Sequence, residues 1–98
     1  MNPRILLVDD EAAIQKTLGP LLQTHGYDVE TAITGHGALK LAAEHPPDLI
    51  VLDLGLPDLD GTEVCRRIRE SSKVPILILS ARGGEADKVR ALDLGAAP

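Results

Sequence analysis

The sequence predicts an α/β fold of the doubly wound kind, in which helices cover both faces of a parallel sheet. Short apolar runs alternate with stretches of helical spacing along all 98 residues, and this alternation is typical of parallel strands joined by right-handed crossovers. The run 49–53 carries no polar side chain before Asp53 and lies between Pro46-Pro47 and Gly55, which indicates a strand buried on both faces. The length fits one domain with a single core.

The first half of the chain contains two predicted strands, each followed by a predicted helix. Residues 4–8 (RILLV) form a short buried strand ahead of Asp9-Asp10. In the helix that follows, Asp10 is expected to cap the start and Gly26 to mark the end. Residues 27–32 alternate polar and apolar side chains, which fits an edge strand. The apolar positions of the two helices are Ile14, Leu18, Leu21, Leu22, Ala38, Leu39, Ala42 and Ala43.

The second half adds the central strand 49–53, a helix, the apolar strand 75–80 (PILILS) and a last helix. The apolar positions of these two helices are Val64, Cys65 and Ile68, then Ala86, Val89 and Leu92. Because the polar strand 27–32 suits an edge, the expected strand order is 2-1-3-4. Strand 75–80 then forms the other edge, although its side chains are as apolar as those of a central strand, which predicts a further neighbour beside it.

Three carboxylates are expected to meet at one rim of this sheet. Asp9 and Asp10 follow the first strand, Asp53 ends the third, and the order 2-1-3-4 makes these strands neighbours. Ligands of open α/β sheets bind at this carboxyl edge. Clustered carboxylates repel one another unless a cation is bound, so they predict a hard-metal site. Mg²⁺ fits this site, with the backbone carbonyl of Gly55 as a further oxygen ligand.

A metal site of this kind suits phosphoryl chemistry. A bound cation with open positions orients a phosphate oxygen, and phosphoryl transfer depends on positioning and charge neutralisation. Asp53 is then the expected nucleophile, forming an aspartyl phosphate. Ser80, at the end of strand 75–80, is placed to donate a hydrogen bond to the phosphoryl group.

Composition narrows the partners and the compartment. The net charge of −5 argues against direct binding to nucleic acid or to an anionic membrane, because both need a basic surface. The single cysteine, Cys65, excludes an internal disulfide and suits a reducing cytosol. No apolar run reaches transmembrane length, and the N-terminus does not resemble a signal peptide. We therefore expect a cytoplasmic protein.

The order of these motifs resembles the receiver domain of two-component response regulators. The segments that carry the resemblance are LLVDDE, DLIVLDLGLPDLDG, VPILILSAR and ALDLGA, which together span the chain. The DLGLPD and SAR segments are similar to the OmpR/PhoB class, including its potassium-transport (Kdp-type) members. The resemblance implies a flavodoxin-like fold and a phosphoprotein that acts as a signalling switch in transcription regulation, not as an enzyme.

The resemblance also implies roles for the rim residues. A histidine kinase would phosphorylate Asp53 in a Mg²⁺-dependent reaction, with Asp10 as a direct metal ligand and Asp9 as a second acidic contact. Gly55 would contribute its carbonyl to the metal, and Ser80 would contact the phosphoryl group. Regulators of this class usually carry a DNA-binding domain downstream, so this fragment is not expected to bind DNA directly.

The chain departs from the family pattern at its C-terminal end. It reads Ala97-Pro98 where acidic residues are usual and stops before a fifth strand and a fifth helix, so residues 1–98 are interpreted as a C-terminally incomplete receiver domain. The family's fifth strand carries a lysine, and losing such a charge partner costs about 2 to 4 kcal/mol of transition-state stabilisation, by analogy with single oxyanion-hole deletions. The lysines that are present, none of them placed to replace it, are Lys16, Lys40, Lys73 and Lys88.

Three other interpretations compete with this one. Asp9 and Asp10 could serve only as helix caps. The segment 58–62 matches the DxDGT signature of haloacid-dehalogenase-type phosphatases, although the apolar strand ends earlier, at Asp53. Finally, the chain could be a receiver-derived scaffold that no longer accepts phosphate and that forms a homodimer or swapped oligomer through the exposed edge of strand 75–80.

Overall fold

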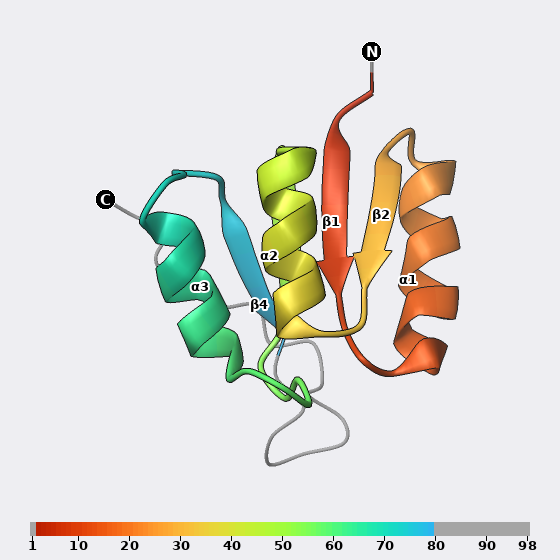
Figure 1. Ribbon diagram of the computed structural model, residues 1–98. Coiled ribbons are helices and arrows are strands. Elements are labelled where there is room, and N and C mark those ends of the chain that lie inside the picture. The colour runs from red at the N-terminus through yellow and green to blue at the C-terminus, as the bar shows by residue number, and fades with distance from the viewer. Residues whose placement is uncertain (1, 80–98) are drawn as a thin grey trace.

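The computed structural model describes residues 2–79, which form a four-stranded parallel sheet and three helices (Figure 1). The elements are β1 (Arg4–Val8), α1 (Ala12–Thr24), β2 (Asp28–Ala32), α2 (Gly35–Glu44), β3 (Leu49–Asp53), α3 (Gly61–Arg69) and β4 (Ile76–Leu79). The strand order is β2-β1-β3-β4 with parallel pairing throughout, which confirms the predicted order. Ser80 and the predicted last helix over Ala86, Val89 and Leu92 lie outside the described residues.

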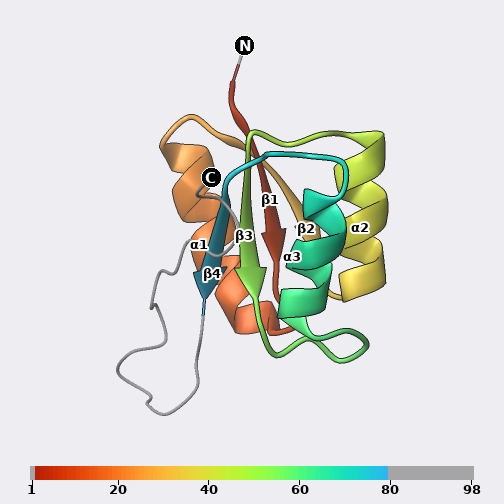
Figure 2. The same ribbon diagram turned by 90° about the vertical axis from the view of Figure 1, so that its left-hand side faces the viewer.

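Within residues 2–79, one helix covers one face of the sheet and two helices cover the other. α1 lies on one face, whereas α2 and α3 lie side by side on the other (Figure 2). Successive side chains of a strand point to opposite faces, so β1, β3 and β4 each supply both layers. The α1 side contains Ile5, Leu7, Val51 and Leu79, and the other side contains Leu6, Val8, Ile50, Leu52, Ile76 and Ile78. This division explains why these strands read as uninterrupted apolar runs.

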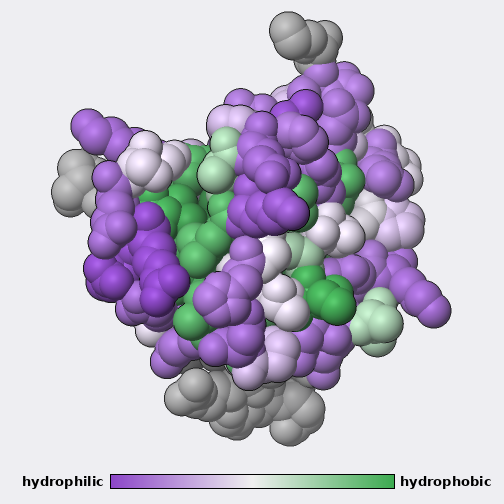
Figure 3. Space-filling model, in the orientation of Figure 1, coloured by the Kyte–Doolittle hydropathy of each residue, from purple (hydrophilic) through white to green (hydrophobic). Residues whose placement is uncertain are grey.

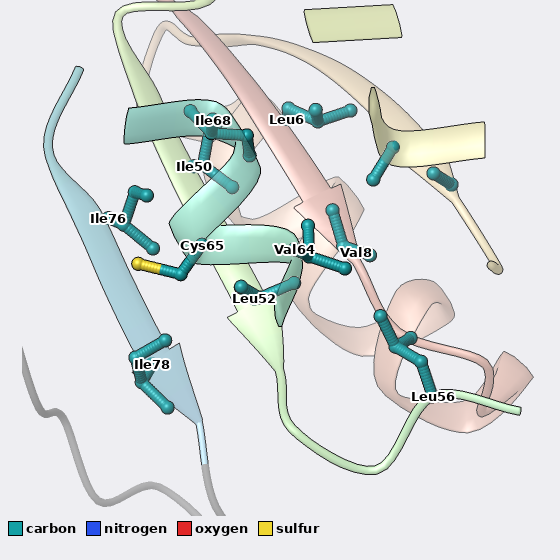
Figure 4. Close-up of a cluster of buried hydrophobic side chains, with 12 residues drawn as sticks. Leu6, Val8, Ile50, Leu52, Leu56, Val64, Cys65, Ile68, Ile76 and Ile78 are labelled. Carbon is teal, nitrogen blue, oxygen red and sulfur yellow. The ribbon is translucent and has the colours of Figure 1, made fainter. Parts of the chain in front are cut away.

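The larger core lies between the sheet and the helices α2 and α3 (Figure 4). Ile50 and Leu52 at its centre have no solvent exposure. Val64 and Ile68 of α3 pack onto these strand residues, and Cys65 is buried beside them, as expected from its apolar position on the helix. Burial of aliphatic side chains on this face stabilises the carboxyl ends of β1 and β3, which carry the acidic residues.

The start of α1 differs from the prediction. The helix begins at Ala12, and its N-cap residue is Glu11, whose side chain makes no capping hydrogen bond. The expectation that Asp10 caps this helix is therefore wrong. Instead, the backbone N–H of Glu11 donates a hydrogen bond to Oδ1 of Asp9 at 2.8 Å. Asp commonly forms such a local turn, in which its side chain binds the backbone two residues later.

The end of α1 agrees with the prediction except at one apolar side chain. The helix ends at Thr24, and Gly26 follows it with a φ of 93°, in the left-handed region where glycine lacks the steric penalty of other residues. Leu21, however, was expected to face the core and is 49% exposed. Leu18 and Leu22 make the contact with the sheet, so the apolar face of α1 is narrower than its sequence suggests.

A groove between α2 and α3 exposes apolar side chains between two polar helix faces (Figure 3). Its apolar lining includes Leu39, Ala42, Pro47, Ile68 and Val74. On the outer face of α3, Arg66 and Arg67 pair with Glu63 at 2.6 and 2.8 Å, and Arg66 also pairs with Glu70 at 2.9 Å. Arg66 and Arg67 thus belong to a solvated helix face, and such exposed pairs contribute little to stability.

Gly61 at the start of α3 lies against the backbone of the loop that follows β3. A Cβ added there would lie 2.6 Å from Cα of Leu54 and 2.8 Å from the carbonyl oxygen of Asp53. Backbone atoms cannot rotate away, so the Gly61→Ala substitution is expected to displace the loop and lower the free energy of unfolding by about 1 to 3 kcal/mol. Chemical denaturation measures this loss.

The matched control is Gly19→Ala in α1, where an added Cβ meets nothing within 4 Å. It is expected to change the free energy of unfolding by less than about 1 kcal/mol. Equal losses for the two substitutions would contradict the steric argument for Gly61.

Candidate metal and phosphoacceptor site

The acidic residues that the sequence brings to one rim lie together in the structure. Asp9 and Asp10 follow β1, and Asp53 is the last residue of β3. The register pairs Val8 with Leu52, so the chain positions directly after these two are adjacent. One carboxylate oxygen from each of the three Asp residues lies within 4.8 Å of the others. The rim can therefore offer three oxygen ligands to one cation.

Asp9 is the most constrained member of this group. It is 4% exposed, and its carboxylate accepts the Glu11 N–H described above. Its backbone N–H is donated to the carbonyl oxygen of Ala32 at 3.0 Å, which extends the β1–β2 ladder past the ends of the strands. Its own carbonyl oxygen accepts a hydrogen bond from Nε2 of Gln15 at 2.7 Å.

Burial and mutual repulsion shift the protonation of these carboxylates. Burial raises the pKa of Asp9 from 3.8 to about 6, the Glu11 N–H opposes this shift, and the charges of Asp53, Glu11 and Asp10 add to it. Burial also raises the pKa of Asp53, opposed by the backbone N–H of Gly55 and reinforced by Asp10 and Glu11. Both shifts show that negative charge at this rim is costly without a counterion.

The donor set fits a divalent cation that prefers oxygen ligands. Across residues 2–79, no lysine, arginine or histidine forms an ion pair with Asp9, Asp10 or Asp53. In octahedral Mg²⁺ complexes the metal–oxygen distance puts opposite ligands about 4.2 Å apart. Neighbouring ligands lie closer still, at about 3 Å. The limit of 4.8 Å among the Asp oxygens exceeds both separations, so binding Mg²⁺ through all three carboxylates requires them to move closer together, unless a water replaces one of them.

Of the other two predicted site residues, the structure describes Gly55 but not Ser80. Gly55 is exposed in the loop after β3, and its backbone N–H faces the Asp53 carboxylate. The role of its carbonyl as a metal ligand stays a prediction. Ser80 lies outside the described residues, so its contact with a phosphoryl group also stays a prediction.

The residues of the DxDGT-like segment cap helices. The Asp58 carboxylate accepts the backbone N–H groups of Gly35 at 2.7 Å and His36 at 3.0 Å, both at the start of α2, and these hydrogen bonds lower its pKa. Asp60 caps α3 by accepting the N–H of Thr62 at 3.0 Å. Neither carboxylate belongs to the rim group. These contacts give the motif a structural explanation, which disfavours the phosphatase interpretation.

Sequence reasoning missed two contacts between residues that are distant in sequence. Asp58 ties the loop after β3 to α2 across 23 positions, and Gln15 bridges the ends of β1 and β2. No local pattern marks either contact, since both partners are backbone groups.

No helix among residues 2–79 combines the length and the apolar character that crossing a membrane requires.

Comparison with known sequences assigns this arrangement to one family. The family model described as "Response regulator receiver domain" matches residues 5–98. The chain is 51% identical over 92 residues to the transcriptional regulatory protein KdpE of Mycobacterium tuberculosis, covering 94% of this chain and 41% of that protein. It is 53% identical over 97 residues to the alkaline phosphatase synthesis transcriptional regulatory protein PhoP of Bacillus subtilis, covering 98% and 40%.

Comparison with solved structures supports the same fold. The non-phosphorylated HemR receiver domain of Leptospira biflexa superposes with a TM-score of 0.78 at 40% identity, covering 85% of this chain and 68% of that one. The chemotaxis response regulator CheY4 of Vibrio cholerae superposes with a TM-score of 0.80 at 33% identity, covering 90% and 76%. The chain spans about two fifths of the length of the curated relatives described above.

Proposed function

Because the chain belongs to the response regulator receiver family, we propose that it is a phosphoacceptor domain in which Asp53 receives a phosphoryl group from a histidine kinase. Its similar proteins KdpE and PhoP are transcriptional regulators of the OmpR/PhoB class. The observation that carries the proposal is the grouping of Asp9, Asp10 and Asp53 at the carboxyl ends of two adjacent strands. If Asp53 served only to end β3, the two carboxylates beside it would bring repulsion and no benefit.

The chemistry proposed for Asp53 is a nucleophilic displacement. One oxygen of its carboxylate attacks the phosphorus of a phosphohistidine, a new O–P bond forms, and the N–P bond to the histidine breaks. Bound at the rim, Mg²⁺ would supply charge neutralisation for the phosphoryl oxygens and the carboxylates. The residues proposed to hold it are Asp9, Asp10, Asp53 and the carbonyl of Gly55. Ser80 is proposed to donate a hydrogen bond to the product.

The raised pKa of Asp53 explains why a cation matters for this step. Burial, reinforced by the charges of Asp10 and Glu11, raises the pKa of Asp53, so the ionised carboxylate that acts as the nucleophile is less favourable here than in water. A divalent cation reverses that balance, since a nearby positive charge stabilises the ionised form. The acidic neighbours therefore serve the reaction only when the metal is bound.

Partners of the whole regulator are proposed from the relatives. A DNA-binding segment is proposed for the parent protein, because the chain spans about two fifths of the length of transcriptional regulators. This chain carries a net charge of −5, which disfavours direct DNA contact. A cytoplasmic location follows as a proposal from the same relatives.

Pairing through β4 stays a prediction. Within residues 2–79, β4 has β3 as its only strand neighbour, and an unpaired edge can recruit a second copy of the chain. Size-exclusion chromatography across a range of concentrations tests the proposal. A monomer at every concentration would contradict it.

Binding of beryllofluoride, a mimic of the phosphoryl group, tests the proposed function without the kinase. We expect saturable changes in the backbone amide NMR signals of the rim when beryllofluoride and Mg²⁺ are added together. We expect no such changes when EDTA replaces Mg²⁺, because the ligand's negative charge then meets uncompensated carboxylates. Identical spectra with and without the complete mixture would contradict the proposal.

A further inference from the structure

We propose that Gln15 is a positioning residue for the acidic site, because its amide fixes the backbone of Asp9 and thereby the separation of the rim carboxylates. Gln15 lies in the first turn of α1 and is half-buried. The inference rests on the proposed function, since it assigns Gln15 a part in metal binding. It concerns a side chain that contacts neither the cation nor the phosphoryl group.

The amide nitrogen of Gln15 joins two strand ends. Nε2 donates to the carbonyl oxygen of Asp9 at 2.7 Å and to that of Ala32 at 3.1 Å. A primary amide carries two hydrogens, so both are used. Ala32 is the last residue of β2, and its carbonyl also accepts the Asp9 N–H at 3.0 Å. The three groups form a closed set of hydrogen bonds immediately before Asp10.

These contacts engage both polar groups of the Asp9 backbone and also its side chain. Its N–H binds Ala32, its carbonyl binds Gln15, and its carboxylate accepts the Glu11 N–H at 2.8 Å. Asp10 is the next residue and is exposed, with no hydrogen bond of its own among residues 2–79 that would orient it. The direction in which Asp10 leaves the sheet is therefore set by the Asp9 peptide, which Gln15 holds.

This constraint matters more for a small cation than for a large one. Mg²⁺ requires near-octahedral geometry at short metal–oxygen distances, whereas Ca²⁺ accepts longer distances and irregular shells. The carboxylate oxygens of the site lie within 4.8 Å of one another, a limit above the separation of about 4.2 Å between opposite ligands of Mg²⁺, so the site has to contract to bind this ion and tolerates little further separation. Loosening the Asp9 backbone should weaken Mg²⁺ binding while Ca²⁺ binding changes little.

The test compares the two cations in the same variants. Gln15→Met keeps the length and helix propensity of the side chain but removes both donated hydrogen bonds. We expect the ratio Kd(Ca²⁺)/Kd(Mg²⁺), measured by calorimetric or NMR titration of the chain, to fall about tenfold, the lower end of the effect of removing a group that orients a metal ligand. The matched control is Gln23→Met on the same helix, exposed in the structure, for which we expect the wild-type ratio.

Gln15→Lys provides the rescue. Its ammonium group restores a hydrogen-bond donor on a flexible side chain. Its added positive charge weakens the binding of both divalent cations alike, so the ratio Kd(Ca²⁺)/Kd(Mg²⁺) should return to within about twofold of wild type. If Gln15→Met does not fold by circular dichroism, Gln15→Asn replaces it, because the shorter amide cannot reach both carbonyl groups. An unchanged ratio in a folded Gln15→Met or Gln15→Asn variant would overturn the role of Gln15.

The same titrations separate failure of this inference from failure of the proposed function. A wild-type chain that binds neither cation contradicts the proposed metal site itself. A wild-type chain that prefers Mg²⁺, together with a Gln15→Met variant that loses affinity equally for both cations, contradicts only the positioning role, since a general loss of charge or order affects both ions.

Discussion

Asp53→Asn is expected to abolish formation of an aspartyl phosphate, whereas Asp58→Asn is expected to leave it. Both substitutions replace a carboxylate by an amide of the same shape, the first at the end of β3 and the second in the loop that follows it. Asp53 lies with Asp9 and Asp10 at the rim, and an uncharged amide there is neither a phosphoryl nucleophile nor a strong metal ligand. Asp58 instead accepts the backbone N–H groups of α2.

Mass spectrometry after treatment with acetyl phosphate and Mg²⁺ distinguishes the two variants. The wild type and Asp58→Asn should gain the mass of one phosphoryl group, and Asp53→Asn should gain none. Asp58→Asn should also lower the melting temperature modestly, because an amide has one oxygen and cannot accept both N–H groups of α2 as well as a carboxylate does. The reverse pattern, with phosphorylation lost only in Asp58→Asn, would support the phosphatase motif.

Asp9→Asn is expected to stabilise the protein at neutral pH when no divalent cation is present. The pKa of Asp9 is about 6 in the folded chain and near its ordinary 3.8 when unfolded. Between these values the folded state binds a proton that the unfolded state has released. The free energy of unfolding therefore falls as pH rises through this window, and it stays low above about pH 6.

The size of this loss follows from the shift. A difference of about two pKa units corresponds to about 2 to 3 kcal/mol, which the buried Asp9 carboxylate costs the metal-free protein at pH 7.5. Asn removes the charge and keeps an oxygen for the Glu11 N–H. We therefore expect Asp9→Asn to be more stable than wild type by about 2 kcal/mol at pH 7.5 and nearly equal to it at about pH 3, below the pKa of the unfolded state.

Urea denaturation in EDTA at several pH values measures the effect, with Mg²⁺ as the complementary probe. Adding Mg²⁺ should raise the stability of the wild type at pH 7.5, where the cation meets ionised carboxylates, and should have little effect at pH 5, where protons compete with it. Asp9→Asn should show a smaller Mg²⁺ effect at pH 7.5. A constant stability difference between the two proteins across pH would contradict the raised pKa of Asp9.

The sequence was informative where local pattern and burial agree. The apolar runs of β1 and β3 predicted the central strands, and the polar pattern of β2 predicted its edge position. From that order alone Asp9 and Asp53 were expected to be neighbours, because the residues after parallel strands meet at one rim. The structure confirms the strand order and the proximity of these carboxylates.

The sequence was less informative where several side chains compete for one backbone group. Asp10 was expected to cap α1, but the preceding Asp9 is buried next to Glu11 and accepts its N–H. Leu21 has helical spacing and is nevertheless 49% exposed, because the helix contacts the sheet along a narrower line. The roles of Gln15 and Asp58 arise from contacts that only the folded chain brings together.

The hydrogen bonds at the acidic rim tie neighbouring loops into one mechanical unit. Asp9 and Gln15 join the loop after β1 to the end of β2, and Asp58 joins the loop after β3 to the start of α2. Movement of one of these loops is therefore transmitted to the element to which its hydrogen bonds connect it. Asp53 and Asp58 lie in one stretch of chain, so a displacement of the loop after β3 would reach the first turn of α2 through the Asp58 hydrogen bonds.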